Sequence, residues 1–87
     1  MTYRVVLSDE AAKVLLRPDA KLRARLQTRL HQLAENPFDP RVSAPLTNRP
    51  GVRKSRVGDW RILFTVDRRT GFVQVATVDT RGQVYRK

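Results

Sequence analysis

The stretch at residues 53–61 reads Arg-Lys-Ser-Arg-Val-Gly-Asp-Trp-Arg and predicts a β-hairpin. Its centre, Gly58-Asp59, is typical of a two-residue loop with glycine in the first position, as a type II′ turn requires. Such a loop places Val57 opposite Trp60 and fixes the register of the two flanking strands.

The same register puts two arginines side by side. Arg56 lies opposite Arg61, and Lys54 shares their face because it lies two residues before Arg56. Like charges directly opposite each other destabilise a sheet, by about 0.2–1 kcal/mol per pair. We therefore expect an anion to bind on this face, provided that the loop has two residues.

Composition narrows the class of partner. The 87 residues carry a net charge of +10, contain no cysteine, and include one histidine, His31. Such charge is typical of proteins that bind nucleic acid or the ribosome, or of proteins masked by an acidic partner, although a merely basic surface would explain part of it. Disulfides, thiolate sites and histidine-rich metal sites are excluded, and no cofactor is implied. His31 is expected to be a partly exposed helical residue.

The N-terminal half predicts one strand and two helices. Residues 3–7 form the strand, and Ser8 caps a short helix that runs to about Arg17. Pro18 is expected as the first residue of a second helix, which Asn36-Pro37 ends. An apolar stripe at helical spacing marks its buried face: Leu22, Leu26, Leu30 and Leu33.

The C-terminal half predicts three strands. A proline-rich connector at residues 37–51 leads to strands near 52–57, 60–67 and 72–79, and Leu46 of the connector is expected in the core. The resulting fold class is α+β, in the order β-α-α-β-β-β, with two helices on one face of a twisted, mainly antiparallel sheet. We expect residues 1–87 to form a single domain. No apolar run approaches the length of a membrane span, and the N-terminus lacks a secretion signal, so a cytoplasmic protein without a membrane partner is expected.

Alternation along the central strand separates two faces of the sheet. The core face holds Trp60, Ile62, Phe64 and Val66, whereas Arg61, Leu63 and Thr65 point the other way. The cationic cluster therefore lies on the sheet face away from the helices.

Residues near the C-terminus extend this cluster. Arg81 follows the last strand and Tyr85 comes four residues later. RNA cleavage by attack of a 2′-OH on the adjacent phosphate needs a base, charge stabilisation and an acid. Arginines stabilise charge, and a lysine crowded by arginines, such as Lys54, could act as the base. A tyrosine can stack on a nucleobase. A hydrolase with two paired carboxylates is not expected, because its candidate acids look like turn or strand-end residues and none has an obvious second carboxylate beside it: Asp59, Asp67 and Asp79.

Two segments resemble the RelE/ParE superfamily of bacterial toxins from type II toxin–antitoxin modules. Residues 45–64 carry its leucine-glycine lead-in, basic residues, Gly-Asp-aromatic-Arg turn and aliphatic-aromatic strand. Residues 81–85 read Arg-Gly-Gln-Val-Tyr, as its C-termini usually do. The resemblance covers nearly the whole chain and implies the RelE-like microbial RNase fold. Trp60 stands where the superfamily more usually has tyrosine, which we expect to affect only packing.

The resemblance also implies a catalytic role for four cationic residues and one tyrosine. Lys54 matches a basic catalytic residue, Arg56 the cation two positions later, and Arg61 the arginine that contacts the scissile phosphate. Arg81 matches a late arginine with an acid or phosphate role, and Tyr85 the tyrosine that stacks on the mRNA base.

The implied function is that of a ribosome-dependent endoribonuclease that cleaves mRNA in the A site. Its implied partners are mRNA, the ribosome with its rRNA, and an acidic, RelB-like antitoxin that folds on binding. Two alternatives stay open. A ParE-like toxin would inhibit DNA gyrase by binding, and a degenerate module would bind only its antitoxin or operator DNA.

Overall fold

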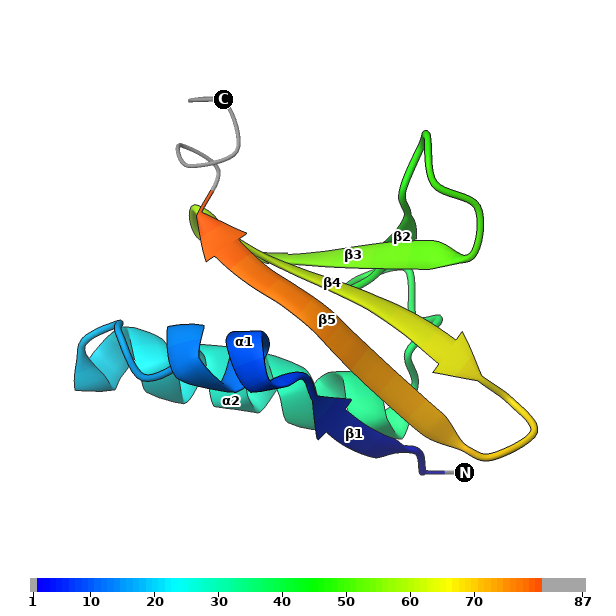
Figure 1. Cartoon of the computed structure of the whole chain (residues 1–87), viewed down its shortest axis with the longest axis horizontal. Helices are drawn as coiled ribbons and strands as arrows, with labels where there is room; N and C mark the ends of the chain where they lie inside the picture. Colours follow the sequence, from blue (N-terminus) through cyan, green and yellow to red (C-terminus); the bar gives the residue numbers. More distant parts are fainter. Residues whose placement is uncertain (1, 81–87) are drawn as a thin grey trace.

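The computed structural model describes residues 2–80 and shows two helices packed against one five-stranded sheet (Figure 1). The elements in chain order are β1 (Arg4–Leu7), α1 (Asp9–Val14), α2 (Ala20–Glu35), β2 (Ala44–Pro45), β3 (Val52–Val57), β4 (Trp60–Asp67) and β5 (Phe72–Thr80). The strands follow one another in space as β1-β5-β4-β3-β2. The predicted α+β fold is confirmed.

The sheet is mixed because its first strand runs beside its last one. β1 pairs in parallel with β5, whereas β2, β3, β4 and β5 form an antiparallel series. Both helices lie on the same side of the sheet, so one face is covered by helices and the opposite face is not (Figure 1).

The first helix is shorter than predicted. Ser8 caps it, since its Oγ accepts a hydrogen bond from the Ala11 N–H at 3.0 Å, but the helix ends at Val14 rather than near Arg17. Beyond Val14 the chain tightens into turns, in which the Leu16 and Arg17 N–H groups donate to the carbonyls of Lys13 and Val14, three residues earlier. Pro18 then disfavours the helical conformation at Arg17, so the helix cannot resume there.

The second helix begins two residues later than predicted, at Ala20 rather than Pro18. Its cap is Asp19, whose Oδ1 accepts from the Leu22 N–H at 2.9 Å, so the prediction that Pro18 is the first helical residue is wrong. An aspartate side chain that accepts this bond is a favourable N-cap, and Pro18 precedes it. The predicted leucine stripe is confirmed, with Leu26, Leu30 and Leu33 buried and Leu22 packed beside them.

The connector contains a strand that the sequence did not reveal. Ala44 pairs with Lys54 and Pro45 with Arg53, which makes β2 a two-residue edge strand. Two residues are too few for a periodic pattern, and proline is tolerated only at a sheet edge. The prediction for Leu46 is wrong, because Val42 is the connector residue that packs against the core cluster.

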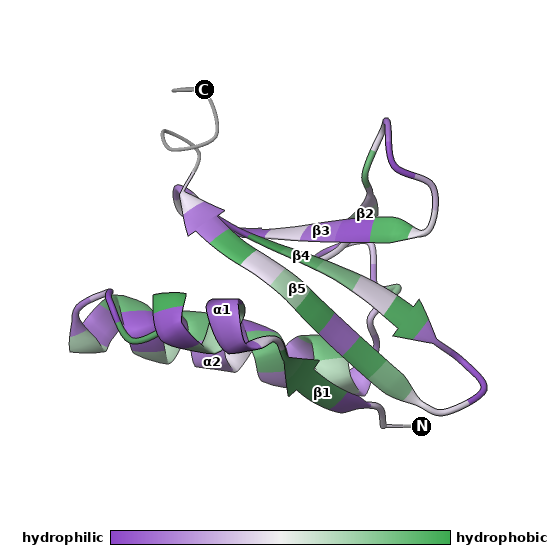
Figure 2. Ribbon diagram, viewed as in Figure 1, coloured by the Kyte–Doolittle hydropathy of each residue, from purple (hydrophilic) through white to green (hydrophobic). Residues whose placement is uncertain are grey.

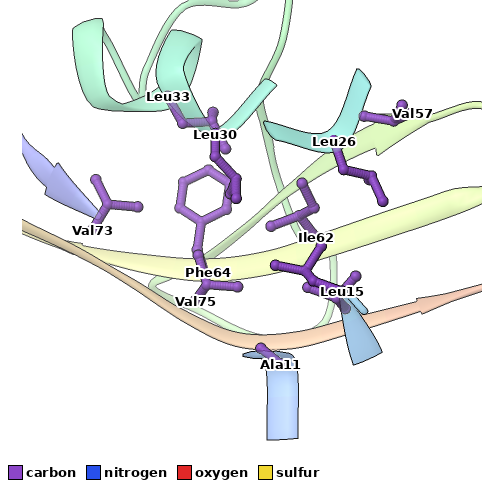
Figure 3. Packing of buried hydrophobic residues seen from close by; sticks show 11 residues of the cluster. Ala11, Leu15, Leu26, Leu30, Leu33, Val57, Ile62, Phe64, Val73 and Val75 are labelled. Atoms are coloured by element: carbon purple, nitrogen blue, oxygen red, sulfur yellow. The ribbon is translucent and has the colours of Figure 1, made fainter. Parts of the chain in front are cut away.

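The core lies between α2 and the sheet. Figure 3 shows Ile62 and Phe64 extending from β4 towards Leu26 and Leu30 of the helix, and both β4 side chains are fully buried. The apolar stretches of β4 and β5 contrast with the hydrophilic centre of β3 (Figure 2). The helix-covered face therefore supplies the stability, and the uncovered face can carry charge.

Candidate functional site: a cationic sheet face

The hairpin at the centre of the site has the predicted register. Val57 pairs with Trp60 and Arg56 with Arg61, so Gly58 and Asp59 are the whole loop. Gly58 has φ +59°, and no non-glycine residue within 2–80 has a positive φ, which matches a type II′ turn. The prediction that Arg56 and Arg61 are opposed is confirmed.

The basic residues of β3 divide between the two faces. Arg53 points to the helix-covered side, where its guanidinium stacks 5.1 Å from the Phe38 ring centroid and its Nε donates to Ser43 Oγ at 2.8 Å. Lys54 and Arg56 take the uncovered side, because the alternating Ser55 and Val57 are buried against the core. We call Lys54, Arg56 and Arg61 the cationic face.

The residues of the cationic face lie close together, and their side chains are partly or fully exposed. In an antiparallel hairpin the pair next to the loop-closing pair is not hydrogen-bonded, and its Cα atoms lie only about 4.5 Å apart. Arg56 and Arg61 form this pair. Arg56 is exposed, whereas Lys54 and Arg61 are half-buried, so the face offers fixed charge to a ligand without closing over it.

Arg61 has an ionic partner that the sequence analysis did not find. Its Nε donates to Asp79 Oδ1 at 3.4 Å, and both side chains are about one-fifth exposed. The carboxylate offsets part of the repulsion between Arg56 and Arg61, and it engages Nε while both terminal nitrogens of Arg61 make no hydrogen bond with residues 2–80.

A β-bulge creates this ion pair. Phe64 pairs with Val75 but the preceding residue, Leu63, pairs with Thr77, which leaves Ala76 as an extra residue in β5. Without the bulge, the register of the β4–β5 turn would put Val78, not Asp79, opposite Arg61. The sequence does contain a signal, since the buried valines Val75 and Val78 are three residues apart rather than two.

Arg29 of α2 joins the site from the other side of the sheet edge. Its Nη1 donates to Ser55 Oγ at 2.9 Å and to the Arg56 carbonyl at 2.6 Å, while its Nε donates to Gln32 Oε1 at 2.9 Å. Arg29 thereby satisfies the Arg56 carbonyl of β3, which lies beyond the residues that pair with the short β2. No local sequence pattern could show these contacts, because Ser55 and Arg56 lie 26 and 27 positions further along the chain.

Other predicted residues are placed as follows. Asp59 lies in the hairpin loop, and Asp67 caps the β4–β5 turn by accepting from the Arg69 and Thr70 N–H groups. His31 is exposed on α2, as expected. Arg81 and Tyr85 lie outside the described residues.

Metal chemistry finds no support in the part of the chain that the structure describes. Residues 2–80 contain no group of three His, Cys, Asp or Glu side chains placed to hold a metal ion. None of the described helices is both long enough and apolar enough to cross a membrane.

Together, the fold and the cationic face define a small α+β protein whose uncovered sheet surface suits a phosphate-bearing or carboxylate-bearing ligand.

Comparison with known proteins gives the family. The sequence model of the family described as "ParE toxin of type II toxin-antitoxin system, parDE" matches residues 5–85. The chain therefore belongs to this toxin family, within the RelE/ParE superfamily that the sequence resembles. No match is found among curated proteins.

Solved structures agree on the fold. The toxin–antitoxin complex RelBE2 from Mycobacterium tuberculosis contains a chain 26% identical, with TM-score 0.78, and the match covers 93% of this chain and 100% of that one. The archaeal RelE–RelB complex from Pyrococcus horikoshii gives 21% identity and TM-score 0.81 over 95% and 99% of the two chains. The YoeB/ParE toxin from Agrobacterium tumefaciens gives 15% and 0.76 over 90% and 98%.

Proposed function

We propose that this toxin is a ribosome-dependent endoribonuclease that cleaves mRNA in the A site. The observation that carries the proposal is the cationic face, on which Arg56 and Arg61 are held opposite each other beside Lys54. Opposed arginines destabilise a sheet, and Asp79 offsets only part of that repulsion, so the pair favours the binding of a further anion. The fold is shared with chains of RelE–RelB complexes, which is consistent with a toxin of that kind.

In the proposed chemistry, side chains of this chain supply the base, the acid and the charge stabilisation. Lys54 acts as the base that removes the proton of the 2′-OH, whose oxygen attacks the adjacent phosphorus. The bond from phosphorus to the 5′-oxygen breaks, which leaves a 2′,3′-cyclic phosphate and a 5′-hydroxyl once the leaving oxygen is protonated. Arg56 and Arg61 stabilise the extra negative charge of the pentacovalent phosphorane.

Asp79 fits this scheme as a positioning residue. By accepting from Nε of Arg61 it fixes the guanidinium and leaves the two terminal nitrogens for a bidentate contact with a phosphate. Arg81 as acid or phosphate ligand, and Tyr85 as the residue that stacks on the mRNA base, complete the proposed site.

Cleavage on programmed ribosomes tests the proposal. Wild-type toxin should cut mRNA at positions that primer extension maps to the A site, and Arg61→Ala should lose at least about 100-fold in rate, since removal of one preorganised charge donor costs that much. Arg69→Ala, which removes an exposed arginine of the β4–β5 turn, is the matched control and should cut normally. Intact mRNA with wild-type toxin would refute the proposal. A lost thermal transition in Arg61→Ala would assign that residue a structural role instead.

A second candidate function follows from the family description. The matching family is named for the ParE toxin, and a ParE-like toxin would inhibit DNA gyrase by binding. Supercoiling by purified gyrase, measured with the same protein preparation, distinguishes the two. Inhibited supercoiling with uncut mRNA would establish the gyrase function.

We also propose an acidic, RelB-like antitoxin as partner, acting in the cytoplasm. Two of the similar structures are toxin–antitoxin complexes, and a net charge of +10 favours an acidic chain. Co-purification with the product of the neighbouring reading frame tests this. A toxin that is isolated alone and leaves growth unaffected would contradict it.

A further inference from the structure

A basic pocket lies at the free edge of β3, beside the cationic face. It has a volume of about 210 Å³ and is lined by four cations, Arg29, Arg41, Lys54 and Arg56, together with the connector at 40–44. Lys54 and Arg56 reach it from the uncovered sheet face and Arg29 from the helix side. The pocket therefore continues the cationic face around the edge of the sheet, where β2 has ended.

The charge in this pocket is poorly compensated. Its lining contains no carboxylate, and within residues 2–80 Arg29, Lys54 and Arg56 form no salt bridge. The one acidic contact is Asp39, whose Oδ2 lies 2.9 Å from Nη2 of Arg41. A side-chain hydrogen bond from Arg41 lowers the pKa of Asp39, so this carboxylate stays ionised at neutral pH and compensates Arg41 alone.

The guanidinium of Arg29 is held in a fixed orientation. Nε and Nη1 are engaged by Gln32, Ser55 and the Arg56 carbonyl, while Nη2 makes no hydrogen bond within the described residues. An arginine that only sealed the β3 edge would need no further cations around it. Three more line the same pocket, and preorganised guanidinium donors favour phosphate.

We propose that this pocket is a second phosphate subsite, which binds a backbone phosphate of the RNA strand whose scissile phosphate lies on the cationic face. Arg41 and Arg29 belong to this subsite alone, and Lys54 and Arg56 lie between the two phosphates. The inference rests on the proposed function because RNA is the ligand. An RNA strand would thus cross the free edge of β3 from the Arg29–Arg41 side to Arg61.

Binding of a short single-stranded 2′-O-methyl oligoribonucleotide tests the subsite without cleavage, because this probe lacks the attacking 2′-OH. Affinity is measured between about 50 and 200 mM salt. Arg41→Gln should reduce the slope of log affinity against log salt by about 0.7, the value for one phosphate contact on a single strand. Arg69→Gln removes the same charge from an exposed arginine outside the pocket and should change the slope much less.

Two further outcomes decide the assignment. Equal salt slopes for Arg41→Gln and Arg69→Gln would overturn the subsite. If Arg41→Gln left the salt slope of RNA binding unchanged but weakened binding of the acidic antitoxin, the pocket would be a binding site for the antitoxin instead. Arg29→Lys keeps the charge but cannot make all three of the Arg29 hydrogen bonds, so the melting temperature should fall while the salt slope stays. If the Arg41 effect is found but mRNA is never cut on ribosomes, the subsite stands and the nuclease function fails.

Discussion

At the scale of the residue, Asp79 is the feature that changes the interpretation of the cationic face. Sequence alone gave an uncompensated pair, Arg56 and Arg61, whereas the structure adds a carboxylate at 3.4 Å from one of them. The carboxylate thus holds the half-buried Arg61 in a fixed orientation and offsets part of the positive charge at that position of the face. The face remains positive because Lys54 and Arg56 form no salt bridge within residues 2–80.

Neutralising Asp79 should therefore strengthen anion binding. Asp79→Asn removes a negative charge beside Arg61, and partly exposed charge pairs of this kind contribute about 0.5–1 kcal/mol. The affinity for the 2′-O-methyl oligoribonucleotide should rise about two- to five-fold. Asp67→Asn makes the same charge change at the far end of β4 and should leave the affinity almost unchanged. Weaker binding by Asp79→Asn would mean that orientation of Arg61 matters more than charge.

At the scale of the element, one serine connects the first helix to the bulge that sets the site. Ser8 accepts from the Ala11 N–H as the cap of α1, and its Oγ donates to the Ala76 carbonyl at 2.9 Å. The Ser8 N–H also donates to the Val75 carbonyl at 2.9 Å. Because Ala76 is the extra residue of β5, this serine holds the backbone that puts Asp79 opposite Arg61.

Variants of Ser8 should separate the two bonds. Ser8→Ala loses both and should lower the free energy of unfolding by about 1–2 kcal/mol, measured by urea denaturation. Ser8→Asp keeps a good cap acceptor but cannot donate to the Ala76 carbonyl, so its free energy of unfolding should also fall measurably below that of the wild type. Asp19→Ala, which removes only the cap of α2, is the matched control at about 1 kcal/mol. Ser8→Asp with wild-type stability would show that the bond to the bulge contributes nothing.

At the scale of the whole molecule, charge repulsion opposes compactness. A net charge of +10 is spread over 87 residues, and the described chain has a radius of gyration of 12.3 Å. At about 0.01 M salt the screening length, about 30 Å, exceeds that radius, so every cation repels every other; at 0.1 M it falls to about 10 Å. Net charge of this size destabilises the folded state.

Added salt should therefore stabilise the isolated toxin. Raising sodium chloride from about 0.01 to 0.1 M should increase the melting temperature, by about 4–8 °C for each kcal/mol of repulsion that is screened. Circular dichroism at constant pH measures the change. A melting temperature that falls over this range would mean that attractive ion pairs outweigh the repulsion.

The sequence by itself determined the elements and the hairpin. The leucine period of α2, the alternation in β4 and the Gly58-Asp59 loop are local patterns, and they sufficed for the α+β fold and for the opposition of Arg56 and Arg61. Local signals also failed near Pro18, where Asp19 proved the better cap, and for the two-residue β2, which is too short to have a period.

Tertiary structure alone decided what surrounds the cationic residues. The Asp79–Arg61 pair depends on one extra residue in β5, and the Arg29 contacts depend on how α2 packs across the edge of β3. Both join residues far apart in the chain, and such contacts are set by packing and register. The sequence therefore predicted which residues are cationic and on which face they lie, and the fold determined which of those charges are compensated and where a second anion can bind.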